Sequence, residues 1–235
     1  MTRKYRAPLL AATMALILGN SASAAERATG LYFEATVGMA SADLGSKSEL
    51  DQSFTGPIVE DLLDDGFEDV TFESSLDDSD IGWGIQIGYQ FHRNFAAEIG
   101  YVNLGEMLYQ ADIETTSGGD PFPFEASLRL KSAGPIAAAV GRFPINERFD
   151  VRATAGLYFA ETKVRDRVRD LAFEENRRHV EHNAGEQEFF AGIGASWNIN
   201  ESYSLLFEYR RFLDVGDDRS GEQDVDLLAV SMLFR

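Results

Sequence analysis

A two-residue alternation of apolar and polar side chains is the feature that most constrains how this 235-residue chain can fold. It is clearest in Ile81–Leu104, where a polar break at residues 92–94 separates two alternating runs. One face carries large side chains and the other carries glycine, glutamine and glutamate. Because side chains two residues apart point to the same face of a strand, this stretch predicts a β-hairpin. The alternation alone fits either a water-soluble sheet whose large side chains face a core or a membrane barrel whose large side chains face lipid.

Six more alternating runs bring the predicted strands to eight, at residues 30–41, 81–91, 95–104, 124–141, 149–159, 189–199, 203–212 and 225–234. Three short connections alternate with four long ones, which we place at about 42–80, 105–124, 161–188 and 213–224. This rhythm predicts an all-β fold, an eight-stranded antiparallel up-and-down transmembrane β-barrel with the long loops outside the cell. A soluble lipocalin-like barrel would point its aliphatic face inward and would not need such regular loop asymmetry.

The first 24 residues predict a cleaved signal peptide. Arg3, Lys4 and Arg6 form a basic start, an apolar segment follows at Ala7–Gly19, and Ala22–Ala24 supplies small residues for cleavage. We therefore expect residues 25–235 to form one outer-membrane β-barrel domain. The chain has no cysteine, so an exported form must be stable without disulfides, as a closed barrel is.

Acidic residues outnumber basic ones, with 39 Asp and Glu against 21 Lys and Arg, which gives a net charge of −18. This balance argues against binding to nucleic acid. Residues 42–80 are strongly acidic, which predicts a solvated loop. Residues 161–188 mix both charges, which makes them the expected contact with lipopolysaccharide or another partner, and Arg165–Asn176 could carry a short helix.

The hairpin also resembles a known family. Gly84, the triplet Gly88-Tyr89-Gln90, the basic residue and Asn of the turn, and Glu98-x-Gly100-Tyr101-x-x-Leu104-Gly105 together resemble the OmpA-like transmembrane domain of bacterial outer-membrane proteins. The resemblance implies an eight-stranded barrel in the outer membrane. We expect the barrel only, without a C-terminal peptidoglycan-binding domain. Such barrels usually end in an aromatic residue that the barrel-assembly machinery reads, and here Arg235 follows Phe234.

The face opposite the large side chains carries charges of both signs, and we expect these to form an ion-pair network in the lumen. Its predicted members are Glu34, Glu98, Arg129, Lys131, Arg152, Glu208 and Arg210. Charges in a confined interior must pair to be tolerated. We expect Glu98 to pair with Arg129 or Lys131 on the adjacent strand, and the network to plug the lumen or to leave only a narrow, gated path.

Aromatic side chains gather towards the strand ends, where they are expected to form girdles at the two membrane interfaces. The predicted interface residues are Trp83, Tyr89, Phe91, Phe95, Tyr101, Trp197, Tyr203, Tyr209 and Phe234.

A structural or surface-interaction role in the outer membrane is the function that this sequence favours. The alternatives are a small-solute channel, a transporter of hydrophobic molecules, and a lipid A-modifying barrel enzyme. No serine lies at a spacing that suggests a nucleophile, so we predict no catalytic residue. The acids Asp77, Asp78 and Asp80 lack the calcium-loop pattern, and His179 and His182 lack a third ligand of obvious spacing, so we predict no metal and no cofactor.

Overall fold

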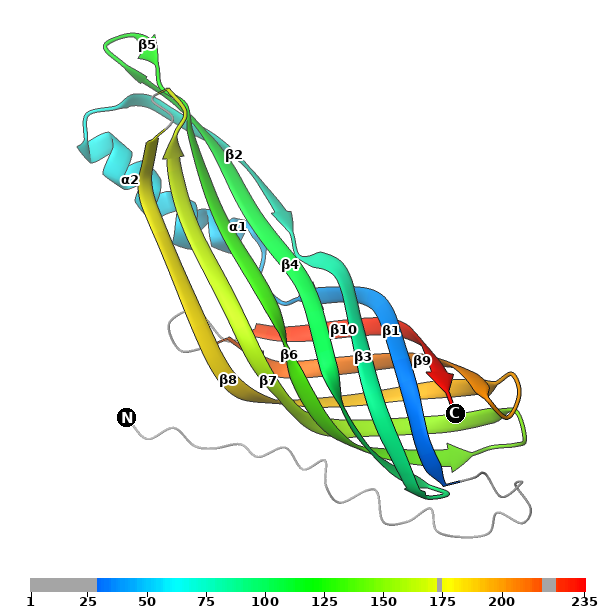
Figure 1. The fold of residues 1–235 in the computed structure, drawn as a ribbon. Coiled ribbons are helices and arrows are strands. Elements are labelled where there is room, and N and C mark those ends of the chain that lie inside the picture. The colour runs from blue at the N-terminus through cyan, green and yellow to red at the C-terminus, as the bar shows by residue number, and fades with distance from the viewer. Residues whose placement is uncertain (1–28, 173–174, 217–222) are drawn as a thin grey trace, which may run out of the picture.

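The computed structural model describes residues 29–172, 175–216 and 223–235. Eight long strands close into an antiparallel barrel (Figure 1). They are β1 (Gly30–Ala42), β3 (Ser79–His92), β4 (Phe95–Ser117), β6 (Phe124–Pro144), β7 (Phe149–Asp170), β8 (Glu175–Asn198), β9 (Tyr203–Val215) and β10 (Gln223–Phe234). β1 pairs with β10, and β4 pairs with β6 on the edge opposite β3, so each of the eight strands has two neighbours. The predicted eight-stranded barrel is confirmed. The predicted signal peptide lies outside the described residues.

Tight turns join the strands at one rim of the barrel, at residues 93–94, 145–148 and 199–202. An asparagine organises each turn. Asn146 Oδ1 accepts hydrogen bonds from the backbone N–H groups of Arg148 and Phe149, at 2.8 and 2.9 Å, and Asn200 Oδ1 accepts the equivalent pair from Ser202 and Tyr203. Asn94 Nδ2 donates to the carbonyl of Arg142 at 2.7 Å. The start of β1 and the end of β10 lie at this same rim.

The outer face of the barrel carries the large apolar side chains that the alternation predicts. Leu31, Ile99, Ile193 and Leu228 are each more than 60% exposed. An exposed apolar band of this extent is stable only against lipid. No helix among the described residues is long and apolar enough to span a membrane.

Four barrel strands continue past the barrel on the opposite rim and, with one added strand, form a protruding sheet (Figure 1). The upper halves of β4, β6, β7 and β8 pair with one another, and β2 (Glu68–Asp77) adds to the edge of β4 in line with β3. The two-residue strand β5 (Asp120–Pro121) closes the hairpin at the tip. The segments predicted as loops at 105–124 and 161–188 are therefore mostly strand.

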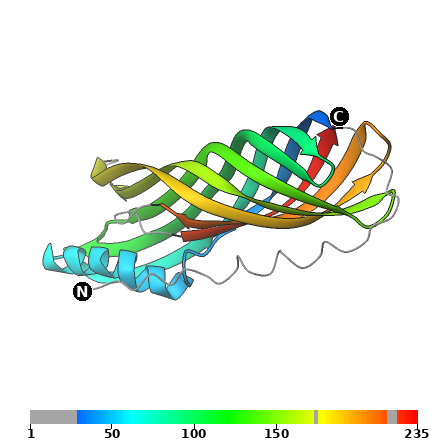
Figure 2. The same cartoon turned by 90° about the horizontal axis from the view of Figure 1, so that it is seen from below.

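A helical segment covers the face of this sheet that continues the lumen side of the barrel (Figure 2). It comprises α1 (Lys47–Leu50), the π-helical turn η1 (Asp51–Thr55) and α2 (Gly56–Asp64). Ser46 and Glu49 form a capping box that starts the segment. Ile58 and Leu62 are buried against apolar side chains of the sheet, which include Tyr109, Ile113, Phe124 and Val168. The predicted acidic loop 42–80 is thus largely folded.

Two further expectations need correction. The short helix suggested for 165–176 is not present in the described part of this span. Residues 165–170 are the end of β7 and residues 175–176 the start of β8, because Val164 and Val168 alternate with cationic side chains and the backbone pairs as a ladder. The face of β6 was also assigned wrongly. Ile136 and Val140 point into the barrel, whereas Arg129 and Lys131 point outward and are exposed.

Candidate functional site

A cluster of charged side chains fills the middle of the barrel lumen and is the candidate functional site. Its members are Glu34, Glu98, Arg152, Glu208 and Arg210, each no more than 2% exposed. They come from four strands, β1, β4, β7 and β9, and they face inward because each is an even-numbered position on a strand whose odd-numbered positions face lipid.

Arg152 is the central connector of this cluster. Its Nη1 donates to Glu34 Oε2 at 2.7 Å and its Nη2 donates to Glu98 Oε2 at 2.6 Å. Its Nε donates to Thr154 Oγ1 at 3.2 Å, and that hydroxyl donates to Glu208 Oε1 at 2.8 Å. The planar guanidinium, with five donors in a fixed fork, suits a position where two carboxylates from different strands must be held at once.

Arg210 makes the second set of contacts. Its Nη2 donates to Glu34 Oε1 at 2.8 Å and its Nε donates to Glu208 Oε2 at 2.9 Å. The Nη2 atom also forms an ion pair with Glu208 Oε2 at 2.7 Å. The amide of Gln86, oriented by its neighbours, donates to Glu34 and accepts from Arg210 Nη1. Glu34 therefore bridges both arginines, and the hydrogen bonds offset the cost of burying these charges.

Apolar layers lie on both sides of the charged cluster. Towards the short-turn rim, Tyr32, Ala96, Val140, Leu206 and Leu233 pack together. Towards the protruding sheet, a larger apolar group includes three packed rings. Phe212 stacks on Phe190 and meets Tyr158 edge-on, at 5.1 Å between ring centroids in both cases. The charged groups are thus enclosed above and below by side chains that exclude water.

Two predicted members do not belong to the cluster. Arg129 and Lys131 lie on the outer face of β6, and Arg129 Nη1 donates to Glu106 Oε1 at 3.2 Å instead. The expected pairing of Glu98 with Arg129 or Lys131 is wrong, since Glu98 pairs with Arg152 on β7, a strand that is not adjacent to β4. The physical reason is the face of β6: Ile136 and Val140 point into the barrel, so the odd-numbered Arg129 and Lys131 point outward.

Sequence reasoning missed two residues beside the cluster. Tyr32 donates a hydrogen bond to Glu98, and its ring occupies the space left by Gly88 on the adjacent strand, where a Cβ would meet the ring. Arg142 is buried, donates to Gln90 Oε1 at 2.9 Å, and lies over the Tyr32 ring at 4.5 Å. Alternation on β1 places Tyr32 inward, but the wrong face assigned to β6 hid Arg142.

The nine predicted interface aromatics all point outward and are at least 38% exposed. They form two groups. Tyr203 packs edge-on against Phe234 near the short-turn rim, at 5.7 Å between ring centroids. Trp83 lies 6.2 Å from Tyr101 near the opposite rim, and Tyr209 Oη donates to Asp226 at 2.6 Å on the same side. This arrangement is the one expected of rings at two water–lipid interfaces, with the location of each girdle still a prediction.

Comparison with known proteins agrees with this architecture. The model of the OmpA-like transmembrane domain family matches residues 26–235. Outer membrane protein A of Shigella dysenteriae is 27% identical over 162 residues, which cover 67% of this chain and 41% of that protein. The chain thus matches less than half the length of that relative.

Solved structures show similarity at low sequence identity. Neisserial surface protein A is 14% identical with a TM-score of 0.45, covering 87% of this chain and 96% of that one. Outer membrane protein OprG from Pseudomonas aeruginosa is 12% identical with a TM-score of 0.39, covering 88% of this chain and 97% of that one.

Proposed function

The chain belongs to the OmpA-like transmembrane domain family and is an outer-membrane β-barrel protein, and we propose that it is a closed anchor that presents a folded module at the cell surface. The module consists of the protruding sheet (upper β4, β6, β7 and β8 with β2) and the helical segment of residues 47–64. The barrel holds this module at a fixed height above the membrane.

One observation carries this proposal: the charged cluster lies between two apolar layers. An eight-stranded barrel has an interior just wide enough for side chains to fill. Here Arg152 and Arg210 are fully ion-paired, and Phe190 and Phe212 pack above them. A solute crossing the lumen would have to separate the ion pairs and displace the rings at the same time.

The same arrangement disfavours the alternative functions. A small-solute channel needs a continuous wetted path, and a carrier of hydrophobic molecules needs an apolar lumen without a charged layer. A lipid A-modifying enzyme would need a catalytic base. His92 is engaged in a turn instead, because its Nδ1 accepts a hydrogen bond from the Asn94 backbone N–H at 3.2 Å. The side chains of His179 and His182 lie outside what the structure describes. We propose a non-catalytic role.

Polar contacts fix the helical segment to the protruding sheet. Tyr109 Oη donates to Asp51 Oδ1 at 2.7 Å, Ser74 Oγ donates to the same oxygen at 2.5 Å, and Thr55 Oγ1 lies 2.6 Å from Tyr109 Oη. These bonds join η1 to β4 and β2, while Ile58 and Leu62 supply apolar contact. A segment held by both kinds of contact keeps one shape at the cell surface, as a recognition module requires.

Surface presentation can be tested by single-cysteine labelling, because the chain has no cysteine of its own. Glu60→Cys places a thiol on the exposed side of α2, and Glu201→Cys places one in a short turn of the opposite rim. Both changes remove one exposed acid, so they are matched. A membrane-impermeant maleimide added to whole cells should label Cys at position 60 and should label position 201 only after the outer membrane is permeabilised.

Labelling of position 201 but not of position 60 in intact cells would reverse the orientation and contradict the proposal. Equal labelling of both in intact cells would show that the barrel does not separate the two rims.

The proposal also places β10, with Phe234 near its end, as the element that the barrel-assembly machinery contacts.

A further inference from the structure

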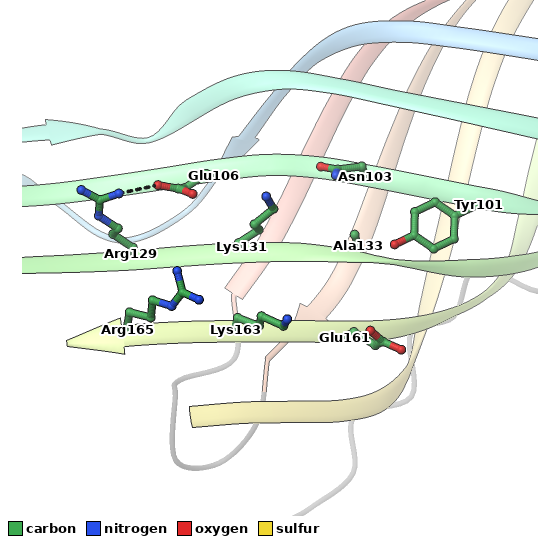
Figure 3. Close-up of a pocket in the computed structure, with 9 residues that line it drawn as sticks. All are labelled: Tyr101, Asn103, Glu106, Arg129, Lys131, Ala133, Glu161, Lys163 and Arg165. Atoms are coloured by element: carbon green, nitrogen blue, oxygen red, sulfur yellow. Dashed lines mark hydrogen bonds and ion pairs between the residues drawn. The ribbon is translucent and has the colours of Figure 1, made fainter. Parts of the chain in front are cut away.

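Four cationic side chains form a compact basic patch on the outer face of β6 and β7. Lys131 lies directly opposite Lys163, and Arg129 lies directly opposite Arg165, two register positions away on the same face. All four are exposed. Figure 3 shows them projecting from the two strands. Together with Glu106 and Glu161 they line a hollow of about 270 Å³.

Like charges directly opposite each other on neighbouring strands destabilise a sheet. Only part of this repulsion is offset within the protein. Arg129 pairs with Glu106 at 3.2 Å and Arg165 pairs with Glu181 at 3.1 Å, and both pairs are solvent-exposed. Within the residues that the structure describes, Lys131 and Lys163 form no ion pair. Two exposed lysines side by side without ion pairs of their own form a surface that an external anion can neutralise.

The patch begins where the apolar band ends. Tyr101 at the edge of that band also lines the hollow, and Phe159 is the last large apolar side chain on the outer face of β7 before Glu161 and Lys163. With a strand rise of about 3.3 Å per residue and a tilt of about 40°, Lys163 lies roughly 10 Å above Phe159. This is the height at which lipid headgroups of the outer leaflet meet the protein.

We propose that Arg129, Lys131, Lys163 and Arg165 bind the phosphate groups of lipopolysaccharide that surrounds the barrel. The inference rests on the proposed function, which places the protruding sheet on the outer side of the membrane. These four cations face outward from the sheet, so lipid molecules that lie beside the barrel can contact them directly. The lysines supply point charges and the arginines supply paired donors, which phosphate oxygens accept.

The test uses the full-length folded protein in a nonionic maltoside detergent, which has no phosphate of its own. Native mass spectrometry then measures the affinity for lipid A with two phosphates. The double variant Lys131→Gln with Lys163→Gln should bind about a hundredfold more weakly, because each of the two charge-assisted contacts contributes about one order of magnitude in affinity. The matched control, Arg93→Gln with Arg148→Gln, removes two exposed cations from the opposite rim and should bind like the unmodified protein.

Three results would overturn the proposal. The first is unchanged affinity in the patch variant. The second is equal binding of lipid A from which the phosphates have been removed. The third is displacement of lipid A by an equal concentration of inorganic phosphate or of a polysulfated saccharide, which would assign the patch to a different anion. Each variant is first checked on a detergent gel with and without boiling. A barrel that does not shift its migration there would instead contradict the membrane-barrel account itself.

Discussion

Arg152 and Arg129 each hydrogen-bond to a glutamate, but their surroundings differ completely. The Arg152 side chain is 1% exposed and contacts two carboxylates that are themselves buried. The Arg129 side chain is 47% exposed, and its partner Glu106 is 37% exposed. Water and ions screen an exposed pair, whereas removal of one partner from a buried pair leaves an uncompensated charge in the interior.

Substitution of these two arginines should therefore give very different results. Arg152→Met should lower the free energy of unfolding by about 3–5 kcal/mol, because Glu34 and Glu98 lose their shared partner. Arg129→Met should change it by less than about 1 kcal/mol. Urea unfolding of the protein in lipid vesicles, followed by tryptophan fluorescence, measures both. Equal destabilisation by the two variants would show that the lumen cluster is not the buried network described.

At the residue scale, alternation in the sequence shows which face a side chain takes but not its partner across the lumen. It places Glu34, Glu98 and Arg152 inward correctly. It cannot show that Arg152 on β7 reaches Glu98 on β4, because that contact depends on barrel tilt and on the relative heights of non-adjacent strands. On β6 the expectation that the larger apolar side chains face lipid is wrong. There the outward residues Ala137 and Ala139 are smaller than the inward residues Ile136 and Val140.

The helical segment of residues 47–64 is the element whose position depends most on a single polar group. Asp51 accepts hydrogen bonds from Ser74 and Tyr109 and lies near Lys47. Partial burial opposes ionisation, but the hydrogen bonds from Ser74 and Tyr109 outweigh it and hold the pKa of Asp51 below its ordinary value of 3.8. A carboxyl with a lowered pKa in the folded state stabilises that state at higher pH.

The contact between this helical segment and the protruding sheet should accordingly weaken at acid pH. The contribution of Asp51 is fully present above its ordinary pKa and is lost as the pH falls through the lowered value. A spin label on Glu60→Cys should be immobile at pH 7 and should gain mobility below about pH 4. Asp51→Asn, which keeps the shape but cannot ionise, should remove the part of this change that Asp51 causes. An identical acid response with and without Asp51→Asn would contradict the assignment.

Element boundaries in the protruding sheet could not be predicted from charge density. Residues 161–170 carry many charges, which predicts a loop, yet they continue β7 because both edges of the strand pair, with β6 on one side and β8 on the other. The helical segment was missed for a similar reason. Its acids face solvent, and the few apolar residues that hold it, Ile58 and Leu62, are buried only because the sheet extends beneath them.

At the scale of the whole molecule, the chain divides into a lipid-facing barrel and a water-facing extension built from the same strands. Strand number, closure and the short-turn rim were predictable, because they depend on a two-residue period and on connection lengths. The filling of the lumen was only partly predictable. Its charged layer is visible in the sequence, but its apolar layers include Phe190 and Phe212, large rings on a face that otherwise carries many small and polar side chains.

Ion conductance of the folded protein in a planar lipid bilayer tests the closed-anchor account most directly. Protein that has passed the boiling test on a gel is inserted in symmetric potassium chloride solution, and the current is followed over voltages of both signs. We expect no stable conductance steps, because the ion-paired layer and the apolar layers together fill the lumen. Reproducible, long-lived open-channel steps from this protein would contradict it and would favour the small-solute channel.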